Sequence, residues 1–338
     1  MLGHVSDYIH IIGDEPSPAP PEVGGKAMGL IGLRSLGLPV PAGFVVKAGA
    51  FDRFIGSLLR PGERLEDLVS LASRDRWDCG PRLSDTRTRI LSAPMPREVE
   101  SAVAAGYDRV FGGEAAVAVR SSSSTEDQEV LSSAGMQESF LNVRGREAVV
   151  DAVRRCWASL WHERAISYLA AARMDATTIR MGVIVQGLVD ADAAGTVFTV
   201  NPTTDNDREI LVNAVLGLGE PAISGRRTPD VFVLDKSGFG VRDRQVAHKD
   251  LMLRPAPGGD GLVEVEVPAD LRDVQSVDDG MLAEIARCAV RIEEHIGRHA
   301  DVEWAVSGGR LVVLQARPVT AQAGGLVRKP HLIEQVRS

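Results

Sequence analysis

The sequence predicts an α+β protein built from two parts that differ in secondary structure. Residues 1–177 contain several segments with the apolar spacing of helices, separated by short apolar strands. Beyond that point most segments have the alternation and turn residues of β-strands. The composition, with 44% apolar and 25% charged residues, is typical of a soluble globular chain. We therefore expect an N-terminal part over 1–177, a C-terminal part over 178–320 and a tail over 321–338.

The N-terminal part is expected to be mainly helical. The expected helices cover 26–36, 48–59, 96–111 and 146–172, and the expected strands cover 43–46 and 115–119. Residues 60–95 have no clear period and indicate a variable helical insert or a loop. The polar segment 121–138 directly follows an apolar strand, and long loops of this kind inside a compact domain are often functional.

The C-terminal part is expected to be mainly β-structure. The expected strands cover 180–189, 194–200, 209–215 and 230–235, followed by a helix over 279–298. A hairpin over 301–306 and 310–317, turned by Ser307-Gly308-Gly309, ends this part. A three-residue loop would place six apolar side chains on the core face: Val302, Trp304, Val306, Val312, Leu314 and Ala316. Four polar side chains would then share the opposite face: Asp301, Glu303, Gln315 and Arg317.

Charge and cysteine usage argue against some classes of function. The net charge of −8 argues against a broad nucleic-acid surface, although one local cluster of cations is sufficient for a nucleotide. The three cysteines, Cys79, Cys156 and Cys288, are far apart and form no CxxC pair, so we expect neither zinc nor disulfides. We see no signal peptide and no apolar run near the roughly 20 residues that span a bilayer. A cytoplasmic protein without a membrane partner is the expectation.

The first segment with possible chemistry is Gly24-Gly25-Lys26, at the start of the first predicted helix. Helix N-termini present free N–H groups and a positive dipole end, which favour phosphate, and a lysine adds a point charge. The segment is not a Walker A loop, because Pro20 and Ala27 stand where that motif needs Gly and Ser or Thr. The alternative interpretation is a glycine-initiated helix with a solvated lysine.

The second segment begins with Arg120, at the exit of an apolar strand, and continues through four serines. An arginine offers a rigid fork of donors and serines add neutral donors, so the segment suits an oxyanion or a polyphosphate. Downstream, Gly135 allows close backbone approach and Ser139 offers a further hydroxyl. The alternative is a flexible, serine-rich surface loop.

The third segment is the polar face of the terminal hairpin. Glu303 and Gln315 can converge on one hard cation through oxygen atoms, as magnesium prefers. Arg317 lies where it could stabilise a phosphoryl group during transfer. The alternative is an exposed hairpin decorated with charges.

The fourth segment combines a strand end with a glycine turn. Gln186 and Leu188 lie at the end of an apolar strand, whose backbone groups can bond to an adenine ring. The later turn Gly217-Leu218-Gly219 can bring Glu220 near a ribose. Each of these two signals is weak alone, because a glutamine at a strand end is usually only solvated.

Together these segments resemble the nucleotide-binding domain of the phosphoenolpyruvate synthase and pyruvate phosphate dikinase family, as also found in rifampin phosphotransferase. The resemblance covers about residues 22–320 in the order of the family. The matching segments are Gly24-Gly25-Lys26, Gly37–Phe44, Val119–Asp127, Ala134–Asn142, Cys156–Trp161, Arg164–Tyr168, Gly217–Glu220, Asp301–Trp304 and Leu314–Pro318.

The resemblance implies an ATP-grasp-like fold with ATP between two α+β lobes. It implies that Lys26 and Arg120 hold the phosphates, while Gly135 and Ser139 line the polyphosphate. It further places Gln186 and Leu188 at the adenine and Glu220 near the ribose. By the same resemblance Glu303 and Gln315 hold Mg²⁺, and Arg317 assists phosphoryl transfer, so that Lys26, Arg120 and Arg317 form the catalytic set.

In the family that this chain resembles, ATP phosphorylates a histidine on a separate swivelling domain, with release of AMP and phosphate. That histidine lies in a Gly- and Thr-rich motif, and none of this chain's histidines has such a setting: His4, His10, His162, His248, His295, His299 and His331. The expected partner is therefore a phosphohistidine-carrying protein or domain, and a small-molecule acceptor binds elsewhere.

Two other functions remain open from the sequence. The chain could be a stand-alone ATP-grasp kinase or ligase that acts directly on a small molecule and releases ADP. It could also be a non-catalytic ATP-binding module, although the complete set of candidate residues argues against that. The nucleotide product, AMP or ADP, separates the first two functions, and tight binding without turnover indicates the third.

Overall fold

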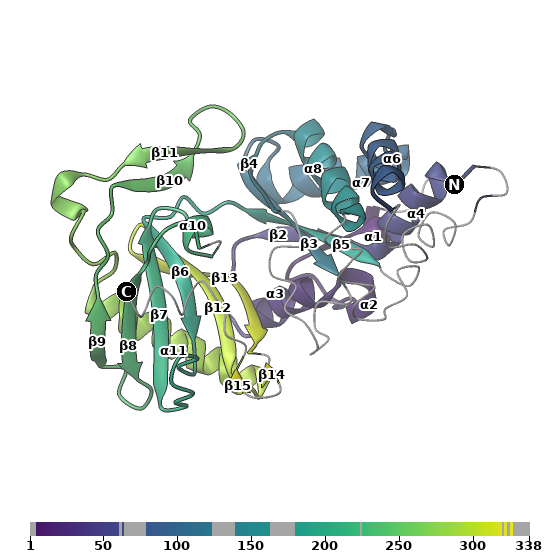
Figure 1. Ribbon diagram of the computed structural model, residues 1–338. Coiled ribbons are helices and arrows are strands. Elements are labelled where there is room, and N and C mark those ends of the chain that lie inside the picture. The colour runs from purple at the N-terminus through teal and green to yellow at the C-terminus, as the bar shows by residue number, and fades with distance from the viewer. Residues whose placement is uncertain are drawn as a thin grey trace. The chain divides into compact units, whose positions relative to one another are not determined.

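The computed structural model describes residues 5–60, 63, 79–123, 139–162, 180–223, 225–319, 321–322 and 325–326. The chain forms two compact units (Figure 1). The first unit comprises Met1–Ile31, Ala42–Leu188 and Gly259–Gly261, and the second comprises Gly32–Pro41, Val189–Gly258 and Leu262–Ser338. Each unit combines helices with a β-sheet of its own, as the α+β prediction requires.

The first unit is organised around a five-stranded antiparallel sheet with the order β1-β2-β5-β3-β4. Its strands are β1 (Ile9–Ile11), β2 (Gly43–Val46), β3 (Val117–Ser123), β4 (Ser139–Val143) and β5 (Met181–Gly187). The central strand β5 follows all the others in sequence, so the sheet is completed only when residues 181–187 insert between β2 and β3. Such non-local pairing is set by tertiary packing rather than by local propensity.

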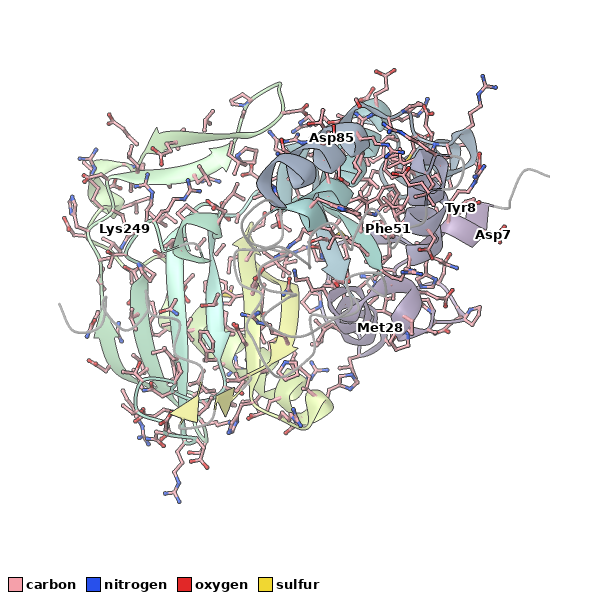
Figure 2. The ribbon with its side chains drawn as sticks, turned by 45° about the vertical axis from the view of Figure 1, so that its right-hand side comes forward. Asp7, Tyr8, Met28, Phe51, Asp85 and Lys249 are labelled. Carbon is pink, nitrogen blue, oxygen red and sulfur yellow. The ribbon has the colours of Figure 1, made fainter. Side chains whose placement is uncertain are left out.

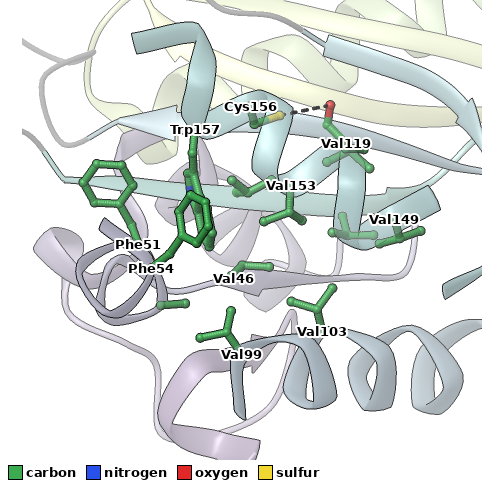
Figure 3. Close-up of a cluster of buried hydrophobic side chains, with 14 of the residues drawn as sticks. Val46, Phe51, Phe54, Val99, Val103, Val119, Val149, Val153, Cys156 and Trp157 are labelled. Carbon is green, nitrogen blue, oxygen red and sulfur yellow. Dashed lines mark hydrogen bonds between the residues drawn. The ribbon is translucent and has the colours of Figure 1, made fainter. Parts of the chain in front are cut away.

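Four helices cover one face of this sheet and enclose the core of the first unit. They are α4 (Ala48–Leu58), α6 (Cys79–Ser92), α7 (Arg97–Phe111) and α8 (Arg146–Ala158). Trp157 on α8 lies at the centre of the cluster in Figure 3, with ring centroids 6.0 Å from Phe51 and 5.2 Å from Phe54. Its indole N–H donates to the Met181 carbonyl at 3.2 Å, so the one polar atom of this buried side chain is satisfied.

The opposite face of the first sheet carries α2 (Pro20–Val23) and the start of α3 (Gly25–Ser35). Figure 1 shows α2 on the side of the sheet away from α6, α7 and α8. The helix α3 begins next to it, and its last residues belong to the second unit. The short α1 (Val5–Tyr8) precedes β1, and the 3-10 turn η1 (Ser159–Trp161) extends α8.

The second unit is built on a six-stranded antiparallel sheet with the order β13-β12-β6-β7-β8-β9. Its strands are β6 (Ala193–Phe198), β7 (Glu209–Leu216), β8 (Asp230–Asp235), β9 (Val241–Gln245), β12 (Ala300–Ser307) and β13 (Arg310–Pro318). The helix α11 (Asp279–Ile296) covers one face with a buried apolar stripe: Leu282, Ile285, Ala286, Ala289 and Ile292. Asp278 caps its start by accepting from the Met281 N–H at 2.8 Å.

Smaller elements complete the second unit. They are α10 (Glu220–Ile223), the 3-10 turn η3 (Ala269–Leu271), the hairpin of β10 (Leu251–Pro255) and β11 (Leu262–Glu266), and the short strands β14 (Ala321–Gln322) and β15 (Gly325–Leu326). The tip of the β10–β11 hairpin is grouped with the first unit. There the Asn142 side-chain amide donates to the carbonyls of Gly259 and Gly261, both at 2.8 Å.

A buried ion pair connects three segments of the second unit. The Asp230 carboxylate is fully buried and accepts from the Lys249 ammonium at 2.7 Å and from the Ala247 N–H at 2.9 Å. Its other oxygen accepts from both the N–H and the hydroxyl of Ser276, each at 2.7 Å. Lys249, labelled in Figure 2, is 7% exposed. Because every oxygen has donors, this buried charge is compatible with a stable fold.

The terminal hairpin differs from its prediction in two compensating ways. Ser307 pairs with Arg310, so the turn contains only Gly308 and Gly309, both with positive φ, and not three residues. The pairing then shifts between Glu303 and Trp304, because a bulge leaves Leu314 without an opposite residue. The predicted core positions Val312 and Leu314 are therefore wrong, and Leu311 and Val313 are buried instead.

The predicted elements of the N-terminal part mostly agree with the structure, but their limits differ in places. The strand 43–46 and the helices near 26–36, 48–59 and 96–111 are present as β2, α3, α4 and α7. The helix expected over 146–172 ends at Ala158, and residues 163–179 lie outside the described part. The expected boundary between 177 and 178 falls there as well, whereas the first unit continues through β5 to Leu188. The strands β1, β4, β9, β10 and β11 had no predicted counterpart.

Candidate functional site

In the first unit, the predicted residues gather on the sheet face opposite the helical core. Along β3, Val117 and Val119 belong to that core, so Ala118, Arg120 and Ser122 lie on the other face. Arg120 pairs with Ser139 of β4, and Ala118 pairs with Gln186 of β5. Directly opposite residues of antiparallel strands share a face, so Arg120, Ser139 and Gln186 lie on the same side.

The start of α3 packs directly against this face. A Cβ on Gly24 would lie 2.3 Å from the Ser122 carbonyl oxygen, and Gly24 has a φ of +82°. The Ala27 N–H donates to the Ser122 hydroxyl at 3.1 Å, across 95 residues of sequence. Only glycine permits this approach, and the Ser122 hydroxyl satisfies one donor of the helix N-terminus. The Gly24-Gly25-Lys26 and Arg120-Ser segments, predicted separately, are therefore neighbours.

Two of the predicted phosphate residues lie at this junction. Lys26 is the second residue of α3 and is half-buried, and Arg120 is half-buried on β3. Ser139 is exposed at the first position of β4. Gly135 lies outside the described residues.

The predicted adenine residues lie at the end of β5. Gln186 is 2% exposed, and its side-chain Nε2 has no hydrogen-bond partner among the described residues. A buried amide N–H₂ without an acceptor is costly unless a ligand or water supplies one. The Leu188 backbone N–H already donates to the Ala116 carbonyl at 3.0 Å. Leu188 can thus offer a base only its carbonyl group or its side chain.

A histidine at the edge of the same sheet stays neutral. His10 on β1 pairs with Val45, which pairs in turn with Ile184 beside Arg120. Burial lowers the pKa of His10, and the positive charge of Lys47 acts in the same direction. The imidazole is consequently uncharged at neutral pH, so it adds no charge to this face.

In the second unit, the hairpin β12–β13 brings four predicted polar residues together as expected. Glu303 lies opposite Gln315, and Asp301 lies opposite Arg317. The Arg317 guanidinium donates to Asp301 Oδ2 from Nη2 at 2.9 Å and from Nε at 3.1 Å. Asp301 is 7% exposed and therefore holds the Arg317 side chain in one orientation.

The bulge at Leu314 is the reason for this arrangement. Without it the two-residue turn would pair Glu303 with Leu314 and would turn Gln315 toward the core face, since one residue of slip exchanges the faces of a strand. With it, the Glu303 carboxylate and the Gln315 amide lie side by side. The sequence predicted that these four residues share a face, but the three-residue loop would have placed Glu303 opposite Val313 and Asp301 opposite Gln315, so the direct pairs were not predicted.

Glu220 lies apart from the hairpin in sequence, at the first position of α10, and forms an ion pair with Arg226. The glycine turn before it is not loose. The Gly217 N–H donates to the Asp192 carbonyl and the Leu218 N–H to the Leu253 carbonyl, both at 2.9 Å. A Cβ on Gly217 would lie 2.5 Å from the Leu253 carbonyl oxygen, so this residue must be glycine.

Two polar residues near the hairpin were missed from the sequence. Thr196 of β6 pairs with Glu303, and Asn213 of β7 pairs with Thr196. Both are almost fully buried, and the Asn213 amide donates to the Thr196 hydroxyl at 3.2 Å. The signal that could have revealed them is a single polar residue inside an otherwise apolar strand, as in Ile-Leu-Val-Asn-Ala-Val-Leu.

These residue types are typical of a protein that binds a polyphosphate and a divalent cation. The first unit has a lysine at a helix N-terminus and an arginine on the strand that this N-terminus contacts, which suits a polyphosphate, and the second unit has a paired carboxylate and amide, which suits a hard divalent cation. The chain belongs to the family described as the pyruvate phosphate dikinase AMP/ATP-binding domain, whose model matches residues 20–336.

Sequence similarity to several named proteins supports this family. The chain is 38% identical over 301 residues to a probable phosphoenolpyruvate synthase of Methanothermobacter thermautotrophicus, covering 88% of this chain and 44% of the relative. It is 38% identical over 304 residues to the prodigiosin synthesizing transferase PigC of Serratia marcescens, covering 90% of this chain and 32% of the relative. An uncharacterized phosphotransferase of Bacillus subtilis, YvkC, is 33% identical over 297 residues, covering 88% and 33%.

The chain spans less than half the length of each of these relatives. The matched portion is the part described by the AMP/ATP-binding family model. Within the described ranges, none of the helices is long and apolar enough to cross a membrane.

Proposed function

We propose that this chain is the ATP-binding component of a dikinase-type phosphotransferase, with an ATP-grasp-like fold. It binds ATP with Mg²⁺ and phosphorylates a histidine on a separate domain or partner protein, for onward transfer to a small molecule. The observation that carries the proposal is the contact between Gly24 and Ser122, which joins the two segments suited to phosphate. The family match and the names of the relatives support the same function.

The first unit supplies the phosphate ligands in this proposal. Lys26 and Arg120 give two positive charges near the N-terminus of α3, where backbone N–H groups also favour anions. Gly135 and Ser139 line the polyphosphate. The unpartnered amide of Gln186 supports its predicted place beside the base, with Leu188, while Glu220 of the second unit serves the ribose.

The second unit supplies the cation ligands. Mg²⁺ usually takes one or two carboxylates together with substrate phosphates and water, and not a full cage of protein ligands. Glu303 and Gln315 offer one carboxylate and one amide oxygen side by side, which fits this requirement. In this proposal phosphate oxygens and water complete the coordination of the cation.

Arg317 is the residue proposed to act in phosphoryl transfer. Asp301 accepts two hydrogen bonds from its guanidinium through one oxygen, so the planar set of N–H donors is held in one orientation. A guanidinium fixed before the reaction stabilises negative charge that develops on a phosphoryl group without reorganisation. Mg²⁺, when bound, would neutralise charge on the phosphate oxygens.

The proposed reaction balances with one water molecule. ATP, a histidine and water give AMP, a phosphohistidine and inorganic phosphate, and the oxygen of the water ends in the inorganic phosphate. The acceptor histidine comes from the separate domain or partner protein. In its sequence, that domain or partner can be identified by a histidine within a Gly- and Thr-rich motif.

The test is an incubation of the chain with α-labelled ATP and Mg²⁺, with and without that partner, followed by separation of AMP and ADP. We expect ATP binding by the chain alone, little AMP without the partner and much more AMP with it. ADP as the product would favour a stand-alone kinase or ligase. Binding without turnover under any pairing would favour a non-catalytic module, and no binding of ATP would overturn the proposal.

A further inference from the structure

Four polar side chains form one row across the second sheet, each directly opposite the next on neighbouring strands. The row is Gln315, Glu303, Thr196 and Asn213, on β13, β12, β6 and β7. Opposite residues of antiparallel strands share a face, and this row shares its face with Ala194, Ala305, Phe198 and Leu211, whose hydrophobic clusters, among the described residues, contain no residue of α11. The proposed cation ligands Glu303 and Gln315 are its first half.

The second half of the row is buried within apolar strands. Asn213 is 2% exposed and Thr196 is 5% exposed. On β6 and β7 the neighbouring pairs on this face are apolar, with Phe198 opposite Leu211 on one side and Ala194 opposite Val215 on the other. Burial of polar groups there is unfavourable unless they bond to one another. The hydrogen bond from Asn213 Nδ2 to Thr196 Oγ1, at 3.2 Å, meets part of that need.

The direction of this hydrogen bond determines what Thr196 can do next. Because the Asn213 amide donates, the Thr196 oxygen is the acceptor, and the proton of its hydroxyl is directed elsewhere. The next side chain in the row is Glu303, directly opposite Thr196. Opposite side chains have Cβ atoms about 4.5–5.5 Å apart, within reach of a hydroxyl and a carboxylate.

We propose that Thr196 and Asn213 are positioning residues for the cation site, in which the Thr196 hydroxyl donates to one oxygen of Glu303. That hydrogen bond holds the carboxylate in one orientation and leaves its other oxygen directed toward the cation beside Gln315. Asn213 fixes the orientation of the Thr196 hydroxyl. This inference rests on the proposed function, because it assigns a role in the same Mg²⁺ site.

A purely structural role predicts a different outcome. If the Thr196 position only needed to fill space between β7 and β12, valine would serve equally well, since it has nearly the same shape and suits a strand. The positioning role that we propose requires the Thr196 hydroxyl for cation binding. Thr196→Val and Thr196→Ser therefore separate shape from hydrogen bonding.

The experiment measures Mn²⁺ as a stand-in for Mg²⁺ by electron paramagnetic resonance, with a non-hydrolysable ATP analogue present. Thr196→Val should weaken Mn²⁺ binding about 10-fold to 100-fold, as loss of such supporting hydrogen bonds typically does. Thr196→Ser should restore most of the affinity. Asn213→Leu should weaken Mn²⁺ binding by less than Thr196→Val, because the hydroxyl remains but loses its fixed orientation.

The matched control is Thr199→Val. Thr199 is also fully buried, but its hydroxyl accepts from the Ala300 N–H at 2.8 Å and lies outside the row. This variant should lower the thermal unfolding temperature without changing Mn²⁺ affinity. Should Thr196→Val fail to fold, Thr196→Ala removes the same hydroxyl with less bulk and serves in its place.

The outcomes separate this inference from the proposed function. Equal Mn²⁺ affinity of wild type and Thr196→Val, or an equal loss in Thr199→Val, overturns the inference and leaves the proposed function intact. A wild-type chain that binds neither the ATP analogue nor Mn²⁺ overturns the proposed function and the inference with it.

Discussion

The two units bring their candidate residues together by different means. In the first unit, Gly24 and Ser122 are far apart in sequence and meet only because α3 packs on a completed sheet. In the second unit, Glu303 and Gln315 belong to one hairpin and need only a short turn and a bulge. The placement of the proposed phosphate residues therefore depends on long-range folding, whereas the placement of the proposed cation residues depends on local register.

The largest expected effect is on catalysis and comes from the second unit. Arg317→Ala should reduce phosphoryl transfer about 10³-fold, because an arginine that stabilises a transferring phosphoryl group contributes at least that much. ATP binding should be largely retained. The measurement is AMP formation with the histidine partner, alongside calorimetric titration with the ATP analogue. Arg310→Ala on the same strand is the control, since Arg310 is exposed beside the turn. Unchanged turnover in Arg317→Ala would remove the assigned role.

The second effect concerns the long-range contact of the first unit. Gly24→Ala should destabilise the protein by on the order of 3 kcal/mol, because the new methyl group meets the Ser122 carbonyl and the φ of +82° is unfavourable. The affinity for ATP should decrease in the same variant. Gly37→Ala is the matched control, because Gly37 has a φ of +71° but nothing within 4 Å of its Cβ. Urea unfolding should show a clearly smaller loss for Gly37→Ala, and equal losses would contradict the proposed steric cause.

Lys26→Ala should have a smaller effect, and that effect should be on ATP binding and not on stability. Removal of one charged donor to a phosphate should weaken ATP binding by about 1.5–3 kcal/mol while the unfolding midpoint stays near that of wild type. Titration with the ATP analogue measures this. Lys47→Ala, which removes a half-buried lysine beside Glu22, provides the comparison. If Lys26→Ala binds ATP as tightly as Lys47→Ala does, Lys26 is only a solvated lysine at a helix start.

The smallest effect concerns a surface contact of the second unit. Hydrogen bonds to Asp273 and then to Asp250 raise the pKa of the exposed His248 above its ordinary value of 6.5. A raised folded pKa means that the stabilising effect is present below about pH 6.5 and is lost as the pH rises through the folded value. His248→Gln should therefore lower the urea midpoint slightly at about pH 5.5 and leave it unchanged at about pH 9. A larger loss at the higher pH would contradict this sign.

The elements with strong apolar periods could be predicted, and those without could not. The helices α4, α7 and α11 and the strand β2 carry clear patterns and lie near their expected positions. By contrast, β9 reads Val-Arg-Asp-Arg-Gln and is exposed over most of its length, so it has no apolar face to detect. The three-residue β1 is too short for any periodic signal.

The candidate site was predicted to a similar extent. The shared polar face of Asp301, Glu303, Gln315 and Arg317 was predicted from spacing within one hairpin, but the direct pairs Glu303–Gln315 and Asp301–Arg317 depend on the two-residue turn and the bulge, which were not predicted. The buried Asn213 and Thr196 were missed because each is a single polar residue in a separate apolar strand. Nothing local indicates that they line up with Glu303 until the strands pair.

The sequence alone determined the family, the two-part α+β organisation and the residue types that suit a phosphate and a hard cation, because these depend on composition and short-range spacing. The tertiary structure decided which side chains are neighbours. The approach of Gly24 to Ser122 arises from packing of α3 on the first sheet, and the row from Gln315 to Asn213 arises from pairing of strands that are distant in sequence. Such pairing depends on packing of the whole unit, and no local pattern encodes its register.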